Sequence, residues 1–100
     1  MNIRLIAFDL DGTLLNSGKT VSPRTKAALT RAAEHGVVLV PATGRLHRDL
    51  PADVASLPSL RYVIAINGAE VFDLKEDRLL YQAELDRKDA LELMKYMDTL

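Results

Sequence analysis

The sequence predicts an α/β fold in which a parallel sheet is flanked by helices. Three apolar segments, at residues 2–8, 37–40 and 62–66, have the length and composition of buried strands. Helices are predicted between them, so strand and helix alternate along the chain. This alternation implies βαβ units, in which right-handed crossovers make the strands parallel and place the helices over the sheet.

The first strand, residues 2–8, is expected to be buried on both faces because its apolar run is continuous. It ends at Asp9, and Gly12 allows the following turn to bend sharply without a Cβ clash. Residues 14–21 include Asn, Ser and Gly and are expected to form a short loop or tight flap.

Helix signals follow the flap. Ser22 as N-cap and Pro23 at the first helical position predict a helix that runs to His35. Gly36 is expected to end this helix, and the second strand, Val37–Val40, begins directly after it.

The second half of the chain continues the pattern. A helix is predicted from Arg45 to about Leu57, with Pro51 interrupting it and Pro58-Ser59 ending it. The third strand is followed by a predicted hairpin of residues 70–74 and 78–82. A last helix is expected from Arg87 to about Asp98, with Asp86 as its cap and Ala90, Leu93, Met94 and Met97 along one face.

Composition excludes several classes of protein. The chain has 100 residues, 48% of them hydrophobic and 27% charged, as in an ordinary globular domain. A net charge of −1 without a basic block argues against a nucleic-acid partner. The chain has no cysteine, so it forms no disulfide, and no apolar run is long enough to span a bilayer. We therefore expect a cytoplasmic protein with no membrane partner; no feature indicates an oligomeric state.

Polar residues or glycine follow each predicted parallel strand. Asp9 and Asp11 follow the first strand, Thr43-Gly44 the second and Asn67-Gly68 the third. In open parallel sheets, ligands bind at the carboxyl ends of the strands. The three strand ends are therefore expected to form one site at one edge of the sheet.

These residue types suit phosphate chemistry. Asp9 is an anion at neutral pH and can attack phosphorus, provided that a cation such as Mg²⁺ offsets the repulsion between the two anions. Asp11, held beside Asp9, is expected to have a raised pKa and to serve as general acid and then base. Thr43 and Gly44 offer a hydroxyl and backbone N–H groups to phosphoryl oxygens, and Arg45 either adds charge there or faces the substrate.

Three motifs carry a resemblance to a known family. Asp9-Leu10-Asp11-Gly12-Thr13-Leu14 resembles the first motif of the haloacid dehalogenase (HAD) superfamily. Ala42-Thr43-Gly44-Arg45 resembles its second motif in the form found in Cof-type phosphatases, and Asn67-Gly68-Ala69-Glu70-Val71 resembles the same subfamily. The resemblance covers essentially the whole chain and implies a Rossmann-like parallel sheet with flanking helices, incomplete here, and the start of an α+β cap domain.

The resemblance also implies roles. Asp9 would be the nucleophile that forms an aspartyl-phosphate, with its carboxylate on Mg²⁺. Asp11 would be the acid/base, and its backbone carbonyl a second metal ligand. Thr43 would bind the transferring phosphoryl group, with Gly44, Arg45 and Asn67 as further phosphate- or substrate-binding residues. The substrate would be a small phosphorylated metabolite such as a sugar phosphate.

The position of the cap follows from chain length. Ten residues, 13 through 22, separate Gly12 from Pro23, which leaves no room for a cap domain there. By the resemblance, the cap is of the C2 type and follows the third strand, so we assign residues 1–83 to the core domain and 84–100 to the start of the cap. The lysine of the third motif and the acids of the fourth are not found in this chain. We therefore expect it to be the N-terminal part of a longer protein and to be inactive alone.

Alternative interpretations exist for each site. Asp9 and Asp11 are also compatible with a solvated turn, Thr43 with a helix N-cap and Arg45 with a surface position. Asn67-Gly68 is also ordinary hairpin chemistry. His35 and His47 have no partners at ligand spacing, so we assign them structural or solvent-facing positions. At the level of function, the alternatives are a phosphomutase of the same superfamily and a truncated, non-catalytic protein.

Overall fold

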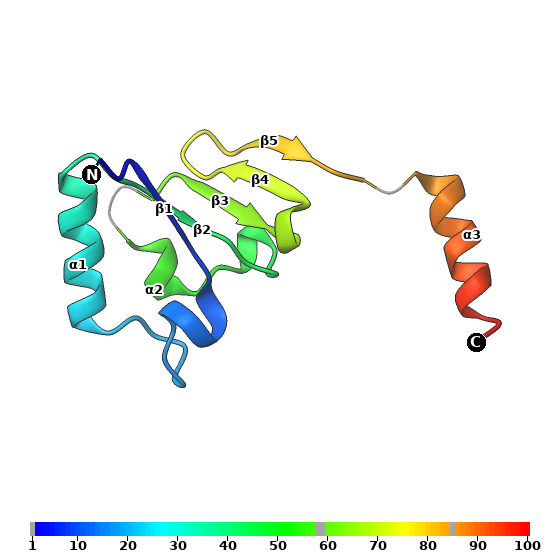
Figure 1. Cartoon of the computed structure of the whole chain (residues 1–100), viewed down its shortest axis with the longest axis horizontal. Helices are drawn as coiled ribbons and strands as arrows, with labels where there is room; N and C mark the ends of the chain where they lie inside the picture. The colour runs from blue at the N-terminus through cyan, green and yellow to red at the C-terminus, as the bar shows by residue number, and fades with distance from the viewer. Residues whose placement is uncertain (1, 58–59, 85) are drawn as a thin grey trace.

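The fold is the predicted α/β arrangement, seen in a computed structural model that describes residues 2–57, 60–84 and 86–100. Strand β1 (Leu5–Phe8) pairs in parallel with β2 (Val38–Pro41), Leu5 lying opposite Val38 (Figure 1). Strand β3 (Tyr62–Ala65) joins the end of β2 through a parallel bridge between Ala42 and Ile64. The three carboxyl ends therefore lie at the same edge of the sheet.

The predicted hairpin is confirmed. Strand β4 (Glu70–Asp73) runs antiparallel to β3, and β5 (Arg78–Gln82) runs antiparallel to β4. The buried carboxylate of Asp73 accepts hydrogen bonds from the guanidinium of Arg61 and from the backbone N–H groups of Lys75 and Glu76. These bonds hold the pKa of Asp73 below its usual value and close the turn between β4 and β5.

Helix α1 (Pro23–Glu34) begins and ends as the sequence indicates. The Ser22 hydroxyl accepts a hydrogen bond from the backbone N–H of Thr25 at 3.2 Å, as an N-cap does. Gly36 has a φ of +85°, the left-handed conformation that commonly ends helices. His35 lies at the helix end with Nδ1 2.8 Å from the carbonyl of Arg31, so its structural assignment is confirmed.

The predicted helix from Arg45 to Leu57 is wrong over its first part. In its place stand a single 3-10 turn at His47–Asp49 and the short helix α2 (Ala52–Ala55). Leu50 precedes Pro51 and is extended, with a ψ of 135°, because a proline disfavours the helical conformation of the residue before it. The predicted break at Pro58-Ser59 lies outside the described residues.

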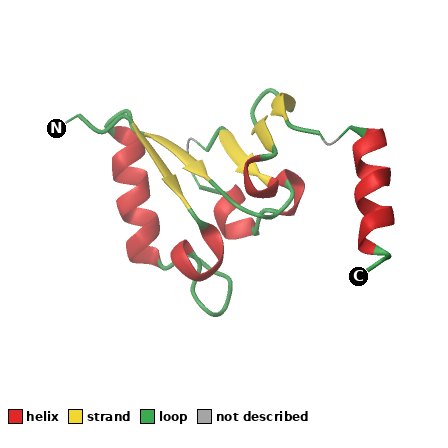
Figure 2. Cartoon of the chain, turned by 45° about the vertical axis from the view of Figure 1, so that its right-hand side comes forward, coloured by secondary structure: helices red, strands yellow, loops and turns green. Residues whose placement is uncertain are grey.

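The expectation that the first strand is buried on both faces is also wrong. Its exposure alternates between exposed and half-buried, and Leu5 retains 56% of its accessible surface. Within the described part of the chain, β2 is the only strand paired with β1, so the second edge of β1 is open. Figure 2 shows β1 and β2 as neighbouring strands with α1 beside them.

The larger of the two hydrophobic clusters includes Leu10, which lies between the two aspartates of the first motif. It comprises Leu10, Leu15, Val21, Val54 and Leu57, with Phe8, Leu14, Leu29, Leu50 and Leu60 packed against it. Leu10 is completely buried although its neighbours Asp9 and Asp11 are exposed. This residue therefore anchors the segment that carries both aspartates.

Removing that anchor should destabilise the protein measurably. Leu10→Ala leaves a cavity in the core, and we expect the free energy of unfolding to fall by about 2–5 kcal/mol. Urea unfolding of the complete protein measures this change. Leu80→Ala, at a position 43% exposed on β5, is the matched control and should change stability by no more than about 0.5 kcal/mol. Equal effects of both substitutions would contradict the anchoring role of Leu10.

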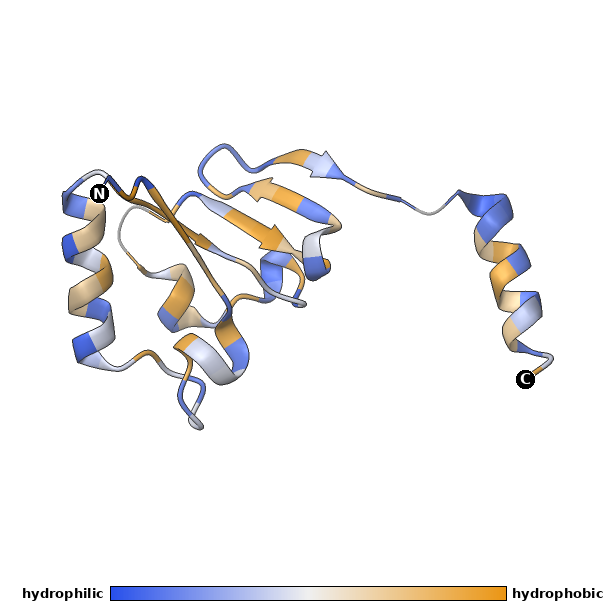
Figure 3. Cartoon of the chain, viewed as in Figure 1, coloured by the Kyte–Doolittle hydropathy of each residue, from blue (hydrophilic) through white to orange (hydrophobic). Residues whose placement is uncertain are grey.

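Helix α3 (Arg87–Met97) lies apart from the rest of the chain in Figure 1. Asp86 is the N-cap residue of this helix, as predicted, but its side chain makes no cap hydrogen bond. The apolar residues coloured orange on this helix in Figure 3 are exposed, with Met94 at 62% and Met97 at 59%. The division into core and cap at residue 84 remains a prediction.

None of the helices in the described segments combines the length and the apolar character needed to cross a bilayer.

Candidate active site

A pocket of about 300 Å³ opens at the carboxyl ends of the three parallel strands. Its lining residues are Asp9, Ala42, Thr43, Gly44, Ile64, Asn67 and Gly68. The structure therefore brings four of the predicted site residues to one pocket. Asp11 and Arg45, the other two, are not among the lining residues and pair with each other beside it.

Asp9 lines the pocket from the end of β1. Its Oδ2 accepts a hydrogen bond from the Thr13 hydroxyl at 3.2 Å, and its backbone carbonyl accepts one from the N–H of Leu14 at 3.3 Å. Gly12 has a φ of +79°, which confirms the predicted glycine turn. The turn after β1 thus makes hydrogen bonds back to both the side chain and the backbone of Asp9, and Asp9 remains exposed to solvent.

Thr43 is buried at the end of β2, with only 5% of its surface exposed. Its Oγ1 accepts a hydrogen bond from the Arg45 N–H at 3.0 Å, so the hydroxyl proton remains available for donation to another group. The Thr43 N–H donates to the carbonyl of Ile64 at 2.9 Å. Thr43 therefore caps the turn that follows it while lining the pocket.

The turn between β3 and β4 lines the pocket next to the end of the third parallel strand. Ile66, Asn67 and Gly68 all have positive φ values, of 50°, 51° and 96°. This conformation is costly for a β-branched residue such as Ile66, and such strain persists where surrounding contacts determine the backbone. Here the contacts are hydrogen bonds from the Ile66 N–H to the Arg45 carbonyl and from the Asn67 N–H to the Thr43 carbonyl, each 3.0 Å long.

Gly44 allows the second strand end and this turn to approach each other. A Cβ at this position would lie 3.1 Å from Oδ1 of Asn67 and 3.5 Å from its Nδ2. Glycine therefore permits the Asn67 amide to lie directly against the backbone of the second strand end. Both interpretations of Asn67-Gly68 describe the structure: the dipeptide makes the hairpin turn and also lines the pocket.

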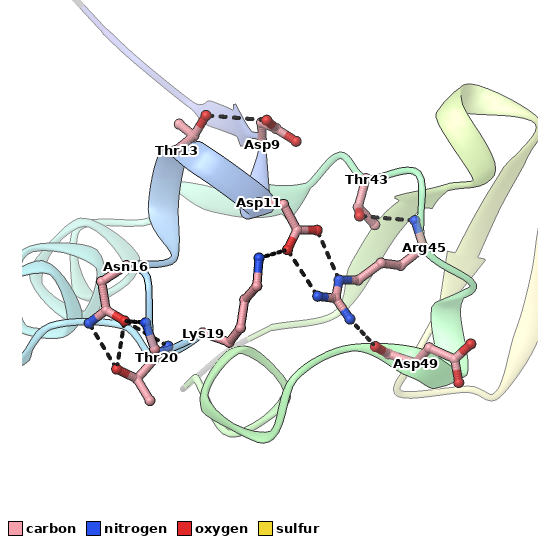
Figure 4. A network of polar contacts seen from close by, with 10 residues as sticks. Asp9, Asp11, Thr13, Asn16, Lys19, Thr20, Thr43, Arg45 and Asp49 are labelled. Carbon is pink, nitrogen blue, oxygen red and sulfur yellow. Dashed lines mark hydrogen bonds and ion pairs between the residues drawn. The ribbon is translucent and has the colours of Figure 1, made fainter.

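Beside the pocket, the Asp11 carboxylate is held between two cations. Arg45 donates from Nε to Oδ2 at 3.0 Å and from Nη2 to Oδ1 at 2.9 Å, and Lys19 donates from Nζ to Oδ1 at 3.0 Å (Figure 4). The hydrogen bonds from Arg45, and then those from Lys19, hold the pKa of Asp11 well below its usual value. The expectation of a raised pKa for Asp11 is therefore wrong.

The carboxylates of Asp9 and Asp11 have different hydrogen-bond partners and do not face each other's partners. In Figure 4 the Asp9 carboxylate is bonded to Thr13, whereas the Asp11 carboxylate faces Arg45 and Lys19. Among the residues that the structure describes, no group of three or more His, Asp or Glu side chains is placed to hold a metal ion. The Asp9 carboxylate in the pocket is nevertheless an oxygen donor of the kind that Mg²⁺ takes together with substrate and water.

The sequence-based prediction was right for His47 and did not identify Lys19. His47 is half-buried, stacks on Phe72 with ring centroids 3.7 Å apart, and lies 3.3 Å from Glu70, so its structural assignment is confirmed. Lys19 was not identified as a site residue. The available signal is that Lys19 is the only basic residue between Gly12 and Pro23, in a loop whose Asn16 and Gly18 favour a tight turn.

Comparison with known proteins defines the class. A family profile for haloacid dehalogenase-like hydrolases matches residues 6–100, and the chain belongs to this family. Its sequence is 38% identical over 97 residues to the phosphatase YwpJ of Bacillus subtilis, covering 97% of this chain and 34% of the relative. It is 35% identical over 98 residues to the pyridoxal phosphate phosphatase YbhA of Escherichia coli, covering 98% of this chain and 36% of that protein.

Solved structures agree. A haloacid dehalogenase-like hydrolase from B. subtilis superposes with a TM-score of 0.80 at 38% identity, over 97% of this chain and 34% of that one. The phosphatase BT1666 from Bacteroides thetaiotaomicron gives a TM-score of 0.82 at 31% identity, over 96% and 36% of the two chains. These matches confirm the HAD-like fold and the resemblance to Cof-type phosphatases. The chain spans about a third of the length of the curated relatives it matches.

Proposed function

We propose that the protein is a Mg²⁺-dependent phosphatase that acts on small phosphorylated metabolites and transfers the phosphoryl group to Asp9. One observation carries the proposal: Asp9, an exposed carboxylic residue, lines one pocket together with Thr43 and Gly44. A nucleophile and neutral hydrogen-bond donors are what phosphoryl transfer requires of a protein. Curated relatives named as phosphatases support the same reaction class.

The proposed reaction has two displacements at phosphorus. In the first, a carboxylate oxygen of Asp9 forms a bond to phosphorus while the bond from phosphorus to the ester oxygen breaks and the alcohol leaves. In the second, a water oxygen bonds to phosphorus, the bond to Asp9 breaks, and phosphate is released with the carboxylate restored. Thr43 and Gly44 would donate to the phosphoryl oxygens as charge is redistributed in each step.

Mg²⁺ would be held by the Asp9 carboxylate and the Asp11 backbone carbonyl, and it would offset the charge of the substrate phosphate. Carboxylate and carbonyl oxygens are ligands that Mg²⁺ prefers, so the residues present fit such an ion. The further acidic ligands and the lysine implied by the HAD resemblance are not among the residues of this chain.

Asp11 is ionised with its two cationic partners in place, so its oxygens could accept a proton in the second displacement. The same partners lower its pKa and so make it a weaker base than an ordinary aspartate while both are bound. To donate a proton to a poor leaving group, Asp11 would first have to loosen its hydrogen bonds to Arg45 and Lys19. We therefore assign the base role to Asp11 as found here and the acid role to a rearranged state.

The test is release of inorganic phosphate by the complete protein from a panel of phosphate monoesters that includes pyridoxal phosphate and hexose phosphates. We expect chelation with EDTA to lower the rate by at least about 100-fold and added Mg²⁺ to restore it. Product analysis separates the alternatives. An isomerised sugar phosphate without phosphate release indicates a phosphomutase, and no turnover in any assay contradicts the proposal.

A further inference from the structure

We propose that Lys19 is a positioning residue that, together with Arg45, holds the carboxylate of Asp11 beside the pocket. The inference rests on the proposed function, in which Asp11 serves the reaction at Asp9. The inference assigns a role in the reaction to Lys19, which lies in the loop that follows the first motif. This loop would then serve to place a cation beside Asp11.

The first step of the argument is the geometry around Asp11. The guanidinium of Arg45 reaches both carboxylate oxygens, at 3.0 and 2.9 Å, and so fixes the plane of the carboxylate. The ammonium group of Lys19 adds a third hydrogen bond, to Oδ1 at 3.0 Å, from a different segment (Figure 4). With two donors on Oδ1 and one on Oδ2, the side chain of Asp11 has little freedom to rotate.

The second step is the construction of the turn that carries Lys19. The Asn16 carbonyl oxygen Oδ1 accepts from the backbone N–H groups of Gly18 and Thr20, at 2.9 and 3.1 Å, and its Nδ2 donates to the Thr20 hydroxyl at 2.8 Å. The backbone of Asn16 and that of Thr20 also pair at 3.0 Å. Beyond the turn, the Val21 N–H donates to Asp53 at 2.8 Å, which ties the end of the loop to α2. Lys19 therefore projects from a braced loop.

The third step is backbone strain at Lys19 itself. Its φ of 59° is in the left-handed region, which glycine or asparagine adopts more readily than lysine. The side chain is 58% exposed, so it contributes little packing, and an ion pair this exposed adds little to stability. Neither packing nor stability accounts for a lysine in this conformation. Delivery of a cation to Asp11 does, because strained residues persist where a defined side-chain position is needed.

The experiment uses Lys19→Gly in the complete protein, since glycine removes the cation and relieves the backbone strain together. We expect kcat for an aryl phosphate, whose leaving group needs no proton donor, to fall by at least about 10-fold while KM changes by less than about threefold. The thermal midpoint should stay unchanged or rise. Lys19→Arg keeps a cation and should recover most of the lost rate. Asn16→Ala removes only hydrogen bonds within the turn that carries Lys19, and it should also lower kcat.

The matched control is Lys75→Met, which removes the same charge from an exposed turn on the far hairpin and should leave kcat unchanged. The inference is overturned if Lys19→Gly retains the wild-type kcat. It is also overturned if the loss of activity follows a loss of thermal stability that Lys19→Arg does not correct, since that result indicates a structural role.

Failure of the proposed function gives a different result, namely no phosphate release by the wild-type protein. In that case the ¹³C resonance of the Asp11 carboxyl at neutral pH, assigned with Asp11→Asn, decides the inference. A shift of this resonance in Lys19→Gly but not in Lys75→Met supports positioning by Lys19. An unchanged resonance in Lys19→Gly refutes it.

Discussion

Asp9→Asn should abolish turnover of every phosphate monoester that the wild-type protein hydrolyses, with a fall in kcat of at least about 1,000-fold. The amide has no anionic oxygen to attack phosphorus. Its carbonyl oxygen can still accept the hydrogen bond from Thr13, so the turn after β1 keeps its geometry. Steady-state phosphate release is the measurement, with circular dichroism and thermal unfolding to show that the fold is retained.

The control for this substitution is Asp77→Asn. Asp77 is exposed in the turn between β4 and β5 and has a φ of 50°, which asparagine tolerates. This variant should hydrolyse phosphate esters at the wild-type rate. Retention of activity by Asp9→Asn, measured after removal of any contaminating wild-type enzyme, would exclude Asp9 as the nucleophile.

Asp11→Asn should separate the two displacements. An aryl phosphate such as p-nitrophenyl phosphate releases a stable anion that needs no proton donor, so the first displacement proceeds without Asp11. The second needs a base to take the proton from water, and removing a general base lowers the rate by roughly 100- to 10,000-fold. We therefore expect a burst of about one equivalent of p-nitrophenol, followed by slow turnover.

Rapid-mixing absorbance measurements detect this burst, and mass spectrometry of the quenched protein should show one added phosphoryl group. Asp77→Asn is again the matched control, because Asp77 is exposed in the turn between β4 and β5 and takes no part in the contacts around Asp11. A variant of Asp11 that loses the burst as completely as the steady state would place Asp11 in the first displacement and contradict its assignment as base.

The position of the pocket was predictable from sequence because it depends on topology. The carboxyl ends of parallel strands lie at one edge of the sheet. Residues that follow these strands, such as Asp9, Thr43 and Asn67, therefore lie close together whatever the conformation of the connecting loops. The helix boundaries at Ser22 and Gly36 were predictable for a similar reason, since hydrogen bonding and φ requirements at helix ends act locally.

The errors have nonlocal causes. Strand β1 has a buried composition, but its burial depends on what covers each face of the sheet, which local sequence does not specify. The raised pKa expected for Asp11 considered only its neighbour Asp9, whereas Arg45, 34 positions away, determines the shift. Lys19 contacts Asp11 from a turn in which the lysine itself has a left-handed conformation, and residue preferences argue against that conformation.

The hydrogen bonds that join the second and third strand ends run between backbone atoms of Thr43, Ile64, Ile66 and Asn67, together with Arg45. Backbone groups are the same in every residue except proline, so most single substitutions leave this framework unaltered. Side chains around the pocket can therefore change from one relative to another while the backbone that shapes the pocket is retained. In these short loops the backbone atoms maintain the structure, and the side-chain atoms are the part that can change the chemistry.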